Sequence, residues 1–174
     1  MFSGMPIIAY PNPILRQKSV PVAEFDGNLI SLVAGMTRAM RTQQGIGLAA
    51  NQVGVAKRVI LIEINKDVVR QRVKRTGTDY GKLLGQTVPL TVLVNPEIVR
   101  VSAKQVKATE GCLSLHGIEV AVVRAESVKV KAQNLSGRAI KISAKGLYAR
   151  VLQHEVDHIN GVLIIDHGKP NPKH

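Results

Sequence analysis

The sequence predicts an α+β domain, with mostly antiparallel sheets packed around a central helix. Three observations support this prediction: an apolar stripe with helical spacing near the N-terminus, a middle section of short β-branched runs, and a second helical stretch near the C-terminus. The chain has 174 residues and no internal repeat, which suits one domain. We therefore expect a single domain over 1–174, with a flexible tail at 167–174.

The first helix is predicted over 28–42. Its apolar residues fall on one face of a 3.6-residue helix: Leu29, Leu32, Val33, Met36 and Met40. The preceding Asp26-Gly27-Asn28 supplies capping residues. We therefore expect an N-terminal amphipathic helix, preceded by a short extended segment over 6–13.

Short runs rich in β-branched and apolar residues predict the strands. They cover 58–64, 91–94, 98–101, 118–123, 127–132 and 139–142. A turn over 134–137 separates the last two strands. The second helix begins near Lys145-Gly146 and ends at Asn160-Gly161, where a left-handed residue can stop it.

The segment 65–86 differs from its surroundings, because it has little periodicity, several glycines and a high basic content. Its basic residues are Lys66, Arg70, Arg72, Lys74, Arg75 and Lys82. These features favour an exposed loop that is mobile in part.

Composition limits the classes of protein to which the chain can belong. Lys and Arg number 24 against 12 Asp and Glu, a surplus that suits contact with a polyanion but also fits lysines that keep a small protein in solution. Aromatic residues for base stacking make up only 3%, and no nucleic-acid-binding motif is present. One cysteine permits no internal disulfide, and no apolar run reaches the ~20 residues of a membrane-spanning helix. The N-terminus also lacks the pattern of a secretory signal.

The most informative motif is the HExxH stretch His154-Glu155-Val156-Asp157-His158, inside the second predicted helix. Residues four apart share a helical face, so both imidazoles can reach one cation. Glu155 stands beside the first ligand, where a carboxylate can take a proton from an attacking water. The alternative is a surface helix that carries two histidines by chance, which the surrounding apolar residues disfavour.

A catalytic metal normally takes three protein ligands, so a third is needed. Cys112, in Glu110-Gly111-Cys112-Leu113-Ser114, is one candidate, and a distant His or Glu is another. A lone cysteine is more often an inert core residue. The HExxH helix in the same small domain favours the ligand interpretation.

A third stretch, Gly45-Ile46-Gly47-Leu48-Ala49-Ala50-Asn51-Gln52, follows the first helix. It is either a flexible loop or a place where small residues let a peptide backbone approach closely. The Gln52 side chain could then donate an amide N–H to a polarised carbonyl.

In this order the three stretches resemble the signature of the peptide deformylases: GxGxAAxQ, EGCxS, and HExxH preceded by glutamine. Further similarity runs from Tyr10-Pro11-Asn12-Pro13 to Asn160-Gly161, so the resemblance covers nearly the whole chain. It implies a metal-dependent hydrolase that removes the formyl group from N-formylmethionyl peptides and nascent chains and releases formate.

The resemblance also implies roles for individual residues. Cys112, His154 and His158 would hold one divalent ion, Fe²⁺ first, with Zn²⁺, Ni²⁺ and Co²⁺ as the other candidates. Glu155 would carry the proton, while the Gln52 side chain and the Leu113 backbone N–H would stabilise the oxyanion. The expected substrate-binding residues are Gly45, Ile46 and Gly47 along the peptide and Leu147 and Val151 in the methionine pocket.

The expected location is a bacterial cytoplasm, or an organelle matrix after removal of a transit peptide. Weak contact with the ribosome is expected through basic residues of 66–82 with Lys169 and Lys173, and neither membrane nor DNA is expected as a partner. Several residues depart from the family pattern: Asn51, Leu115 with His116, and Glu119 where many members carry a basic residue. The chain also ends eight residues after Asp166, so the longer C-terminal helix of many members is not expected.

Two other functions remain open on the sequence alone. A zincin-like metallopeptidase would use the same HExxH helix, but such enzymes take a third His or Glu rather than a cysteine. A non-catalytic homologue that binds nascent chains or RNA would suit the net charge of +12, although it would have no use for Glu155.

Overall fold

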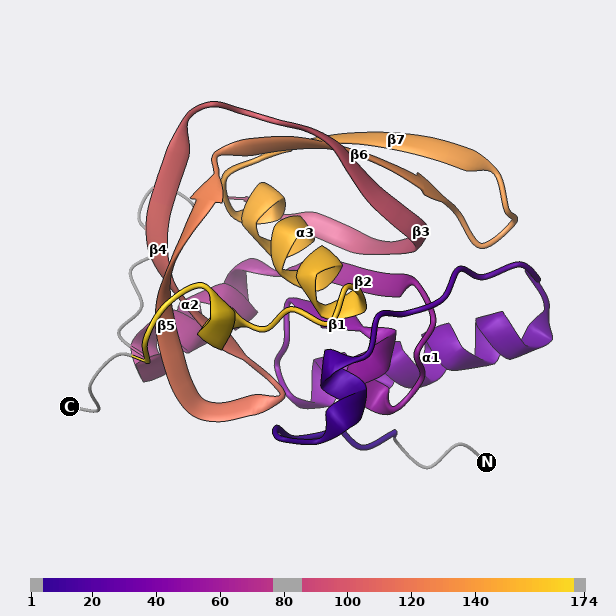
Figure 1. The fold of residues 1–174 in the computed structure, drawn as a ribbon, viewed down its shortest axis with the longest axis horizontal. Helices are drawn as coiled ribbons and strands as arrows, with labels where there is room; N and C mark the ends of the chain where they lie inside the picture. The colour runs from indigo at the N-terminus through magenta and orange to yellow at the C-terminus, as the bar shows by residue number, and fades with distance from the viewer. Residues whose placement is uncertain (1–4, 77–85, 171–174) are drawn as a thin grey trace.

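The computed structural model describes residues 5–76 and 86–170, which form two antiparallel sheets and three α-helices (Figure 1). The larger sheet has the strand order β1-β2-β3-β6-β7, and β4 pairs with β5 as a separate ribbon. The helices are α1 (Gly27–Thr42), α2 (Lys66–Thr76) and α3 (Gly146–Ile159). The strands are β1 (Gly47–Ala49), β2 (Val59–Ile64), β3 (Val88–Val101), β4 (Gln105–Cys112), β5 (Leu115–Ala125), β6 (Ser127–Gln133) and β7 (Ala139–Lys145).

The helix α3 occupies the centre of the molecule (Figure 1). It packs against one face of the larger sheet, where residues of α3, β2, β3 and β6 form one core cluster, including Leu147, Leu152, Ile62, Leu93 and Val130. Gly161 adopts a φ of 77° directly after the end of α3, as predicted. The helix that carries the HExxH motif is therefore fixed by burial along most of its length.

The helix α1 covers the opposite face of the same sheet, over β1 and β2. Asp26 caps it by accepting hydrogen bonds from the backbone N–H groups of Asn28 and Leu29. Residues Met36 and Met40 pack there against Leu61. Because alternate residues of β2 face α3 and α1, this strand is buried on both sides and reads as an apolar run from Val59 to Ile62.

The β4–β5 ribbon lies beside α3 and encloses a third core cluster with Leu15, Leu163 and Ile164. Cys112 ends β4, and the chain turns back into β5 at Leu115. This turn places the EGCxS stretch against α3, although the two are about 40 residues apart in sequence.

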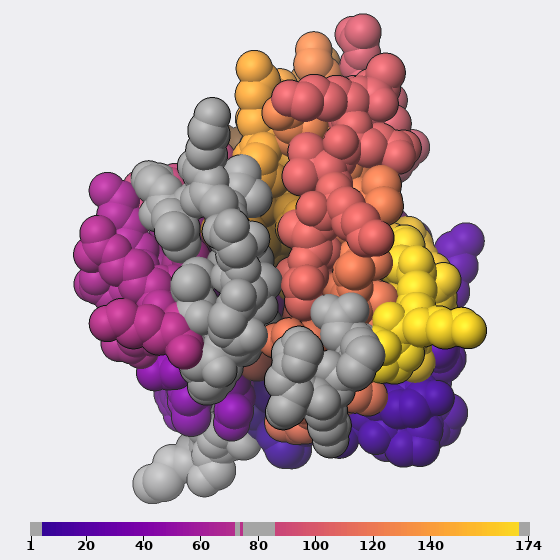
Figure 2. Space-filling view, turned by 90° about the vertical axis from the view of Figure 1, so that its left-hand side faces the viewer, coloured from indigo at the N-terminus to yellow at the C-terminus, as the bar shows by residue number. Residues whose placement is uncertain are grey.

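The structure corrects several predicted elements. The expected loop over 65–86 is wrong for 66–76, which forms α2 on the side of the molecule shown in Figure 2, and 77–85 lie outside the described residues. The two strands predicted at 91–94 and 98–101 are one bulged strand, β3. The strand β4 was not predicted, and the small-residue stretch after α1 contains β1 and a 3₁₀ turn instead of a flexible loop.

The remaining predicted strands, the turn over 134–137 and the second helix are confirmed. Of the expected tail at 167–174, residues 171–174 lie outside the described residues, while Pro170 forms an isolated bridge with Val120. Within the described ranges, no helix is long and apolar enough to cross a membrane.

Candidate metal centre and adjoining pocket

Three side chains from two elements converge at the C-terminal end of β4. His154 and His158 lie one turn apart on α3, and Cys112 faces them from the strand. The Nε2 atoms of the two histidines are 3.2 Å apart, and the Cys112 Sγ lies 3.2 Å from His158 Nε2. The three potential donor atoms all lie within 4.8 Å of one another.

This donor set fits a divalent transition metal. Ligands at about 2.0–2.3 Å from a tetrahedral ion lie roughly 3.3–3.6 Å from one another, close to the separations found here. Two imidazoles and one thiolate suit Zn²⁺ or Fe²⁺ better than Ca²⁺ or Mg²⁺, which prefer oxygen. Three protein ligands leave a position open for water or substrate.

Glu110 sets the orientation of His154. Its Oε2 lies 2.9 Å from His154 Nδ1, and because a carboxylate only accepts, the proton of the ring must be on Nδ1. The lone pair of Nε2 is then directed toward Cys112 and His158. A carboxylate behind a histidine ligand is a common way of fixing the ring and raising its basicity.

The charges around Cys112 favour the ligand form of the thiol. Burial alone would raise its pKa, but the charge of His158 and hydrogen bonds to both histidines lower it well below its ordinary value. A thiolate is the form that binds metal.

The pKa of Glu155 is shifted in the opposite direction, above its ordinary value. Burial raises its pKa, and the nearby histidines offset only part of that rise. Its Oε2 is buried and has no hydrogen-bond partner among the described residues. A carboxylate with a raised pKa and an unused oxygen, in a pocket beside the three donors, is suited to accepting and returning a proton.

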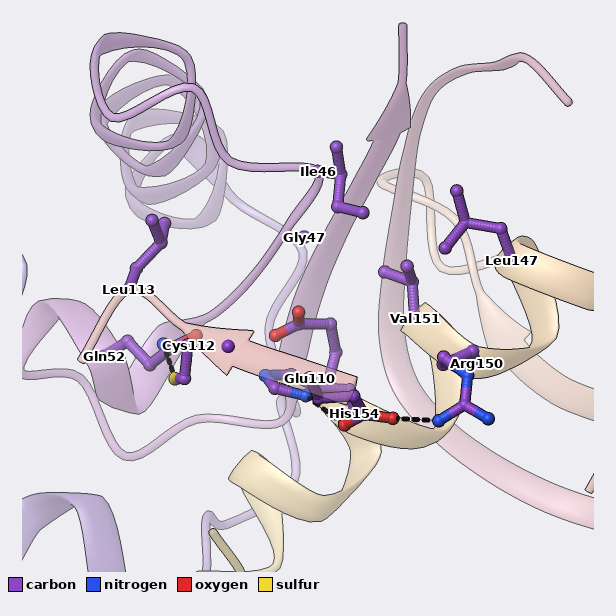
Figure 3. A pocket seen from close by; sticks show the side chains of 12 residues that line it. Ile46, Gly47, Gln52, Glu110, Cys112, Leu113, Leu147, Arg150, Val151 and His154 are labelled. Carbon is purple, nitrogen blue, oxygen red and sulfur yellow. Dashed lines mark hydrogen bonds and ion pairs between the residues drawn. The ribbon is translucent and has the colours of Figure 1, made fainter. Parts of the chain in front are cut away.

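A pocket opens beside the three donors (Figure 3). Its lining residues are Ile46, Gly47, Gln52, Glu110, Gly111, Cys112, Leu113, Leu147, Arg150, Val151, His154 and Glu155. Ile46, Leu147 and Val151 form an apolar part at one end, away from Cys112 and Gln52 (Figure 3). The pocket thus joins an apolar recess to a polar, metal-binding end.

Most of the predicted site residues meet in this pocket. The exceptions are Gly45 and His158, which do not line it: Gly45 lies against Leu113 and Met40, and His158 is buried behind the pocket wall. The Gln52 amide donates to Ser114 Oγ at 3.1 Å and to Cys112 Sγ at 3.5 Å. Its Oε1 accepts from the Ala49 backbone N–H, which holds the side chain in place.

Gly47 is small because Glu155 lies against it. A Cβ at this position would stand 2.2 Å from Glu155 Oε1 and 2.8 Å from Val151 Cγ1. We therefore expect Gly47→Ala to displace the carboxylate and lower kcat by about tenfold, since small misplacements of a catalytic group are costly. Gly27→Ala is the matched control, because a Cβ there meets nothing within 4 Å. Equal kcat in both variants would show that the close approach of Gly47 to Glu155 is not needed.

A buried ion cluster behind His154 was missed by the sequence reasoning. Glu110 accepts two hydrogen bonds from Arg124, at 2.7 and 2.9 Å, and one from Arg150 at 2.7 Å. Arg124 also donates to Asp157 at 2.7 Å. Burial alone would raise the pKa of Glu110, but the hydrogen bonds from Arg124 and His154 hold it well below its usual value.

Two signals for this cluster were present in the sequence. Glu110 belongs to the cysteine motif, and Arg150 precedes His154 by four residues, on the same helical face. Arg124 gave none, because only the pairing of β5 with β4 brings it to Glu110. Removing one partner from such a cluster typically costs roughly 3–5 kcal/mol, so the cluster supports the fold as well as the site.

Known proteins are similar to this chain in sequence and in fold. The family model for polypeptide deformylase matches residues 5–174. A peptide deformylase of Acidobacterium capsulatum is 40% identical over 161 residues, covering 92% of this chain and 84% of the relative.

Solved structures of peptide deformylases are also similar to this chain. A plant peptide deformylase is 37% identical with a TM-score of 0.81, covering 97% of this chain and 83% of its own. A peptide deformylase of Acinetobacter baumannii, solved with Met-Ala-Ser bound, is 31% identical with a TM-score of 0.81, covering 97% of this chain and 100% of its own.

Proposed function

The chain belongs to the peptide deformylase family, and on that basis we propose that it hydrolyses the formyl group from N-formylmethionyl nascent peptides with the residues of the described pocket. The observation that carries the proposal is the convergence of Cys112, His154 and His158 beside Glu155, whose buried Oε2 has no hydrogen-bond partner among the described residues. The family match over 5–174 supports treating the whole chain as one catalytic domain.

Cys112, His154 and His158 would hold one divalent ion per chain. When bound, such an ion acts as a Lewis acid toward the formyl oxygen and makes water a better nucleophile at neutral pH. We propose Fe²⁺ as the ion used in the cell, with Zn²⁺, Ni²⁺ and Co²⁺ as ions that the same donors accept. The thiolate donates more charge than a third imidazole would, so the choice of ion should affect the rate.

Glu155 carries the proton in this proposal. Its carboxylate accepts a proton from the attacking water and delivers it to the amine that leaves with the peptide. The raised pKa of Glu155 suits the second step, because burial makes the protonated form that delivers the proton less costly to reach. Gly47 leaves the space that the carboxylate occupies.

The developing oxyanion would accept hydrogen bonds from the Gln52 side chain and the Leu113 backbone N–H. Both Nε2 contacts of Gln52 are made within the protein, to Ser114 and Cys112, so one would be exchanged for the substrate oxygen. The contact to Cys112 is the longer of the two and is the one we expect to be exchanged.

The substrate backbone would add to the larger sheet at β1. This strand forms one edge of the sheet, and its start at Gly47 borders the pocket. Extended peptides bind to such edges through backbone hydrogen bonds, and Gly45 to Gly47 would present that edge. The methionine side chain would enter the apolar recess of Ile46, Leu147 and Val151.

A comparison of three substrates tests the proposal. The metal-loaded protein is incubated with formyl-Met-Ala-Ser, acetyl-Met-Ala-Ser and unblocked Met-Ala-Ser-Ala. We expect rapid release of a free amine from the first alone, because the close packing around Glu155 favours the smallest acyl group. Cleavage of the unblocked peptide without deformylation would favour a zincin-like peptidase instead.

The proposed cellular setting is a bacterial cytoplasm or an organelle matrix, where formylated nascent chains are made. Weak ribosome contact through the basic segment 66–82 remains a prediction. Neutralising Arg70, Arg72, Lys74 and Arg75 together should weaken co-sedimentation with ribosomes at low salt, while turnover of a short formyl peptide stays the same. Unchanged co-sedimentation would show that these four residues do not contribute to ribosome binding.

A further inference from the structure

The larger sheet has one region that no helix covers. On the α3 side, β6 and β7 contribute Val128, Val130 and Ala144 to the core. On the opposite side, the cluster beneath α1 contains no residue of β6 or β7 among the described residues. The outward positions of these strands are therefore open to solvent.

Those positions are basic. Burial alternates along β6 and β7, and the exposed residues include Lys129 and Lys131 on β6 and Lys141 and Lys145 on β7. Arg100 of β3 is in register with Lys129 and is also exposed. We call these five residues the basic face: Arg100, Lys129, Lys131, Lys141 and Lys145.

Most of the positive charge of the basic face has no ion-pair partner among the described residues. None of the five forms an ion pair with a described residue, and the acidic side chain in register with them is that of Glu97, opposite Lys131. At one end, Arg100, Lys129 and Lys145 border a hollow that Ser127, Ser143 and Tyr148 of α3 also line. Lysine ammonium, guanidinium and hydroxyl groups are the usual donors to phosphate oxygens.

Protection of a sheet edge accounts for only part of this pattern. The strand β7 is an edge, where lysines discourage pairing with another chain. The strand β6 lies between β3 and β7, so Lys129 and Lys131 guard no edge. Lys129 pairs with Arg100 and Ser143, and Lys131 pairs with Glu97 and Lys141. Two of these four pairs oppose like charges, which destabilises a sheet, and a bound anion would relieve that cost.

We propose that the basic face binds the phosphate backbone of RNA. Its strands contain no aromatic residue, and Tyr148 of α3, which lines the hollow, is partly buried, so we expect little base stacking and a contact independent of sequence. The outward residues of β6 and β7 include no large apolar side chain to enter a lipid layer. The choice of RNA rests on the proposed function, because a formylated nascent chain emerges from a ribosome.

The placement of the basic face suits a docked enzyme. It lies on the side of the sheet away from α3, which carries His154, Glu155 and His158 (Figure 1). RNA bound there would leave the pocket open to a peptide. The basic face spans about 14 Å along β7, enough to follow several phosphates.

Two triple variants of the full, metal-loaded chain test this inference. K129Q/K131Q/K141Q removes three charges from the basic face, and K18Q/K57Q/K107Q removes three from exposed lysines elsewhere. Binding of a fluorescent oligouridylate is measured against salt concentration, with polyglutamate and anionic vesicles as competing probes. Thermal melts check that both variants fold.

We expect the basic-face variant to bind the oligouridylate roughly 10²-fold more weakly at low salt, and its slope of log K against log salt to fall by about 2. The control variant should keep the affinity and slope of the parent. Equal loss in both variants, or binding of polyglutamate or vesicles as tight as that of RNA, would overturn the inference.

Formate release from a short formyl peptide, measured in parallel, separates the two proposals. Turnover should be the same in the parent and in both variants, because the basic face contributes nothing to the pocket. Loss of RNA binding with normal turnover supports the inference. Normal RNA binding by the basic-face variant with normal turnover rejects the inference and leaves the deformylase proposal in place.

Discussion

Glu155→Gln should remove nearly all turnover while the metal content stays near one ion per chain. The amide keeps the shape of the side chain, and Cys112, His154 and His158 are unchanged, so the ion is still held. The amide cannot take a proton from water, and a general acid–base residue contributes roughly 10²–10⁴-fold to the rate. Measuring kcat and metal content on the same preparation distinguishes lost chemistry from lost metal.

Glu126→Gln is the matched control for that experiment. This glutamate is paired with Lys104 on the surface, and its loss should leave kcat unchanged. A fall of less than tenfold in Glu155→Gln would show that another group carries the proton. Loss of the metal together with the activity would show that Glu155 mainly supports the metal site.

Cys112→Ser should reduce metal binding and activity together. A neutral hydroxyl is a poor replacement for a thiolate, and the charges that favour the thiolate would face an oxygen that stays protonated. Because Cys112 contributes a donor directly, the loss of affinity should exceed the roughly 10–100-fold typical of an outer-shell partner.

Substitution of Co²⁺ gives this prediction a spectroscopic readout. The parent should show a thiolate-to-metal charge-transfer band that Cys112→Ser lacks. Ser114→Ala is a suitable control, because it removes a hydroxyl that accepts from Gln52 but keeps the backbone N–H that donates to Cys112 Sγ and leaves the thiolate in place. An unchanged band in Cys112→Ser would place the third ligand elsewhere.

Local periodicity was sufficient to predict the parts of the fold that position the metal. The helix α3 shows helical spacing, two histidines on one face and a glycine at its end, all of which act within a few residues. The strand β2 was recognisable because both of its faces are buried, which leaves an apolar run with polar boundaries.

Elements held by tertiary contacts were harder to predict. Residues 66–76 are so rich in charge that their helical spacing was obscured, yet Val69 is buried in the main core. The strand β4 mixes lysine, threonine and glycine and is defined by its pairing with β5. Pro96 lies between the two strands predicted at 91–94 and 98–101, and a bulge accommodates it within the single strand β3.

Residues of the site that are joined only by tertiary contacts were likewise not predicted together. The three motifs indicated the donors and Glu155, because each motif keeps its residues within a few positions. The cluster of Glu110, Arg124 and Arg150 joins residues 14 and 40 positions apart. Glu110 and Arg150 each lie near a motif, but only the fold brings them to Arg124, so spacing along the chain could not show that the three form one cluster.

The central claim is that one ion held by Cys112, His154 and His158 supports deformylation. It is tested most directly by titrating metal-free protein with Fe²⁺ under anaerobic conditions and measuring formate released from formyl-Met-Ala-Ser. We expect the rate to rise linearly to one equivalent of Fe²⁺ per chain and then stay constant, with formate and Met-Ala-Ser formed in equal amounts. Formate release that does not depend on added metal, or cleavage of the peptide without formate, would contradict the claim.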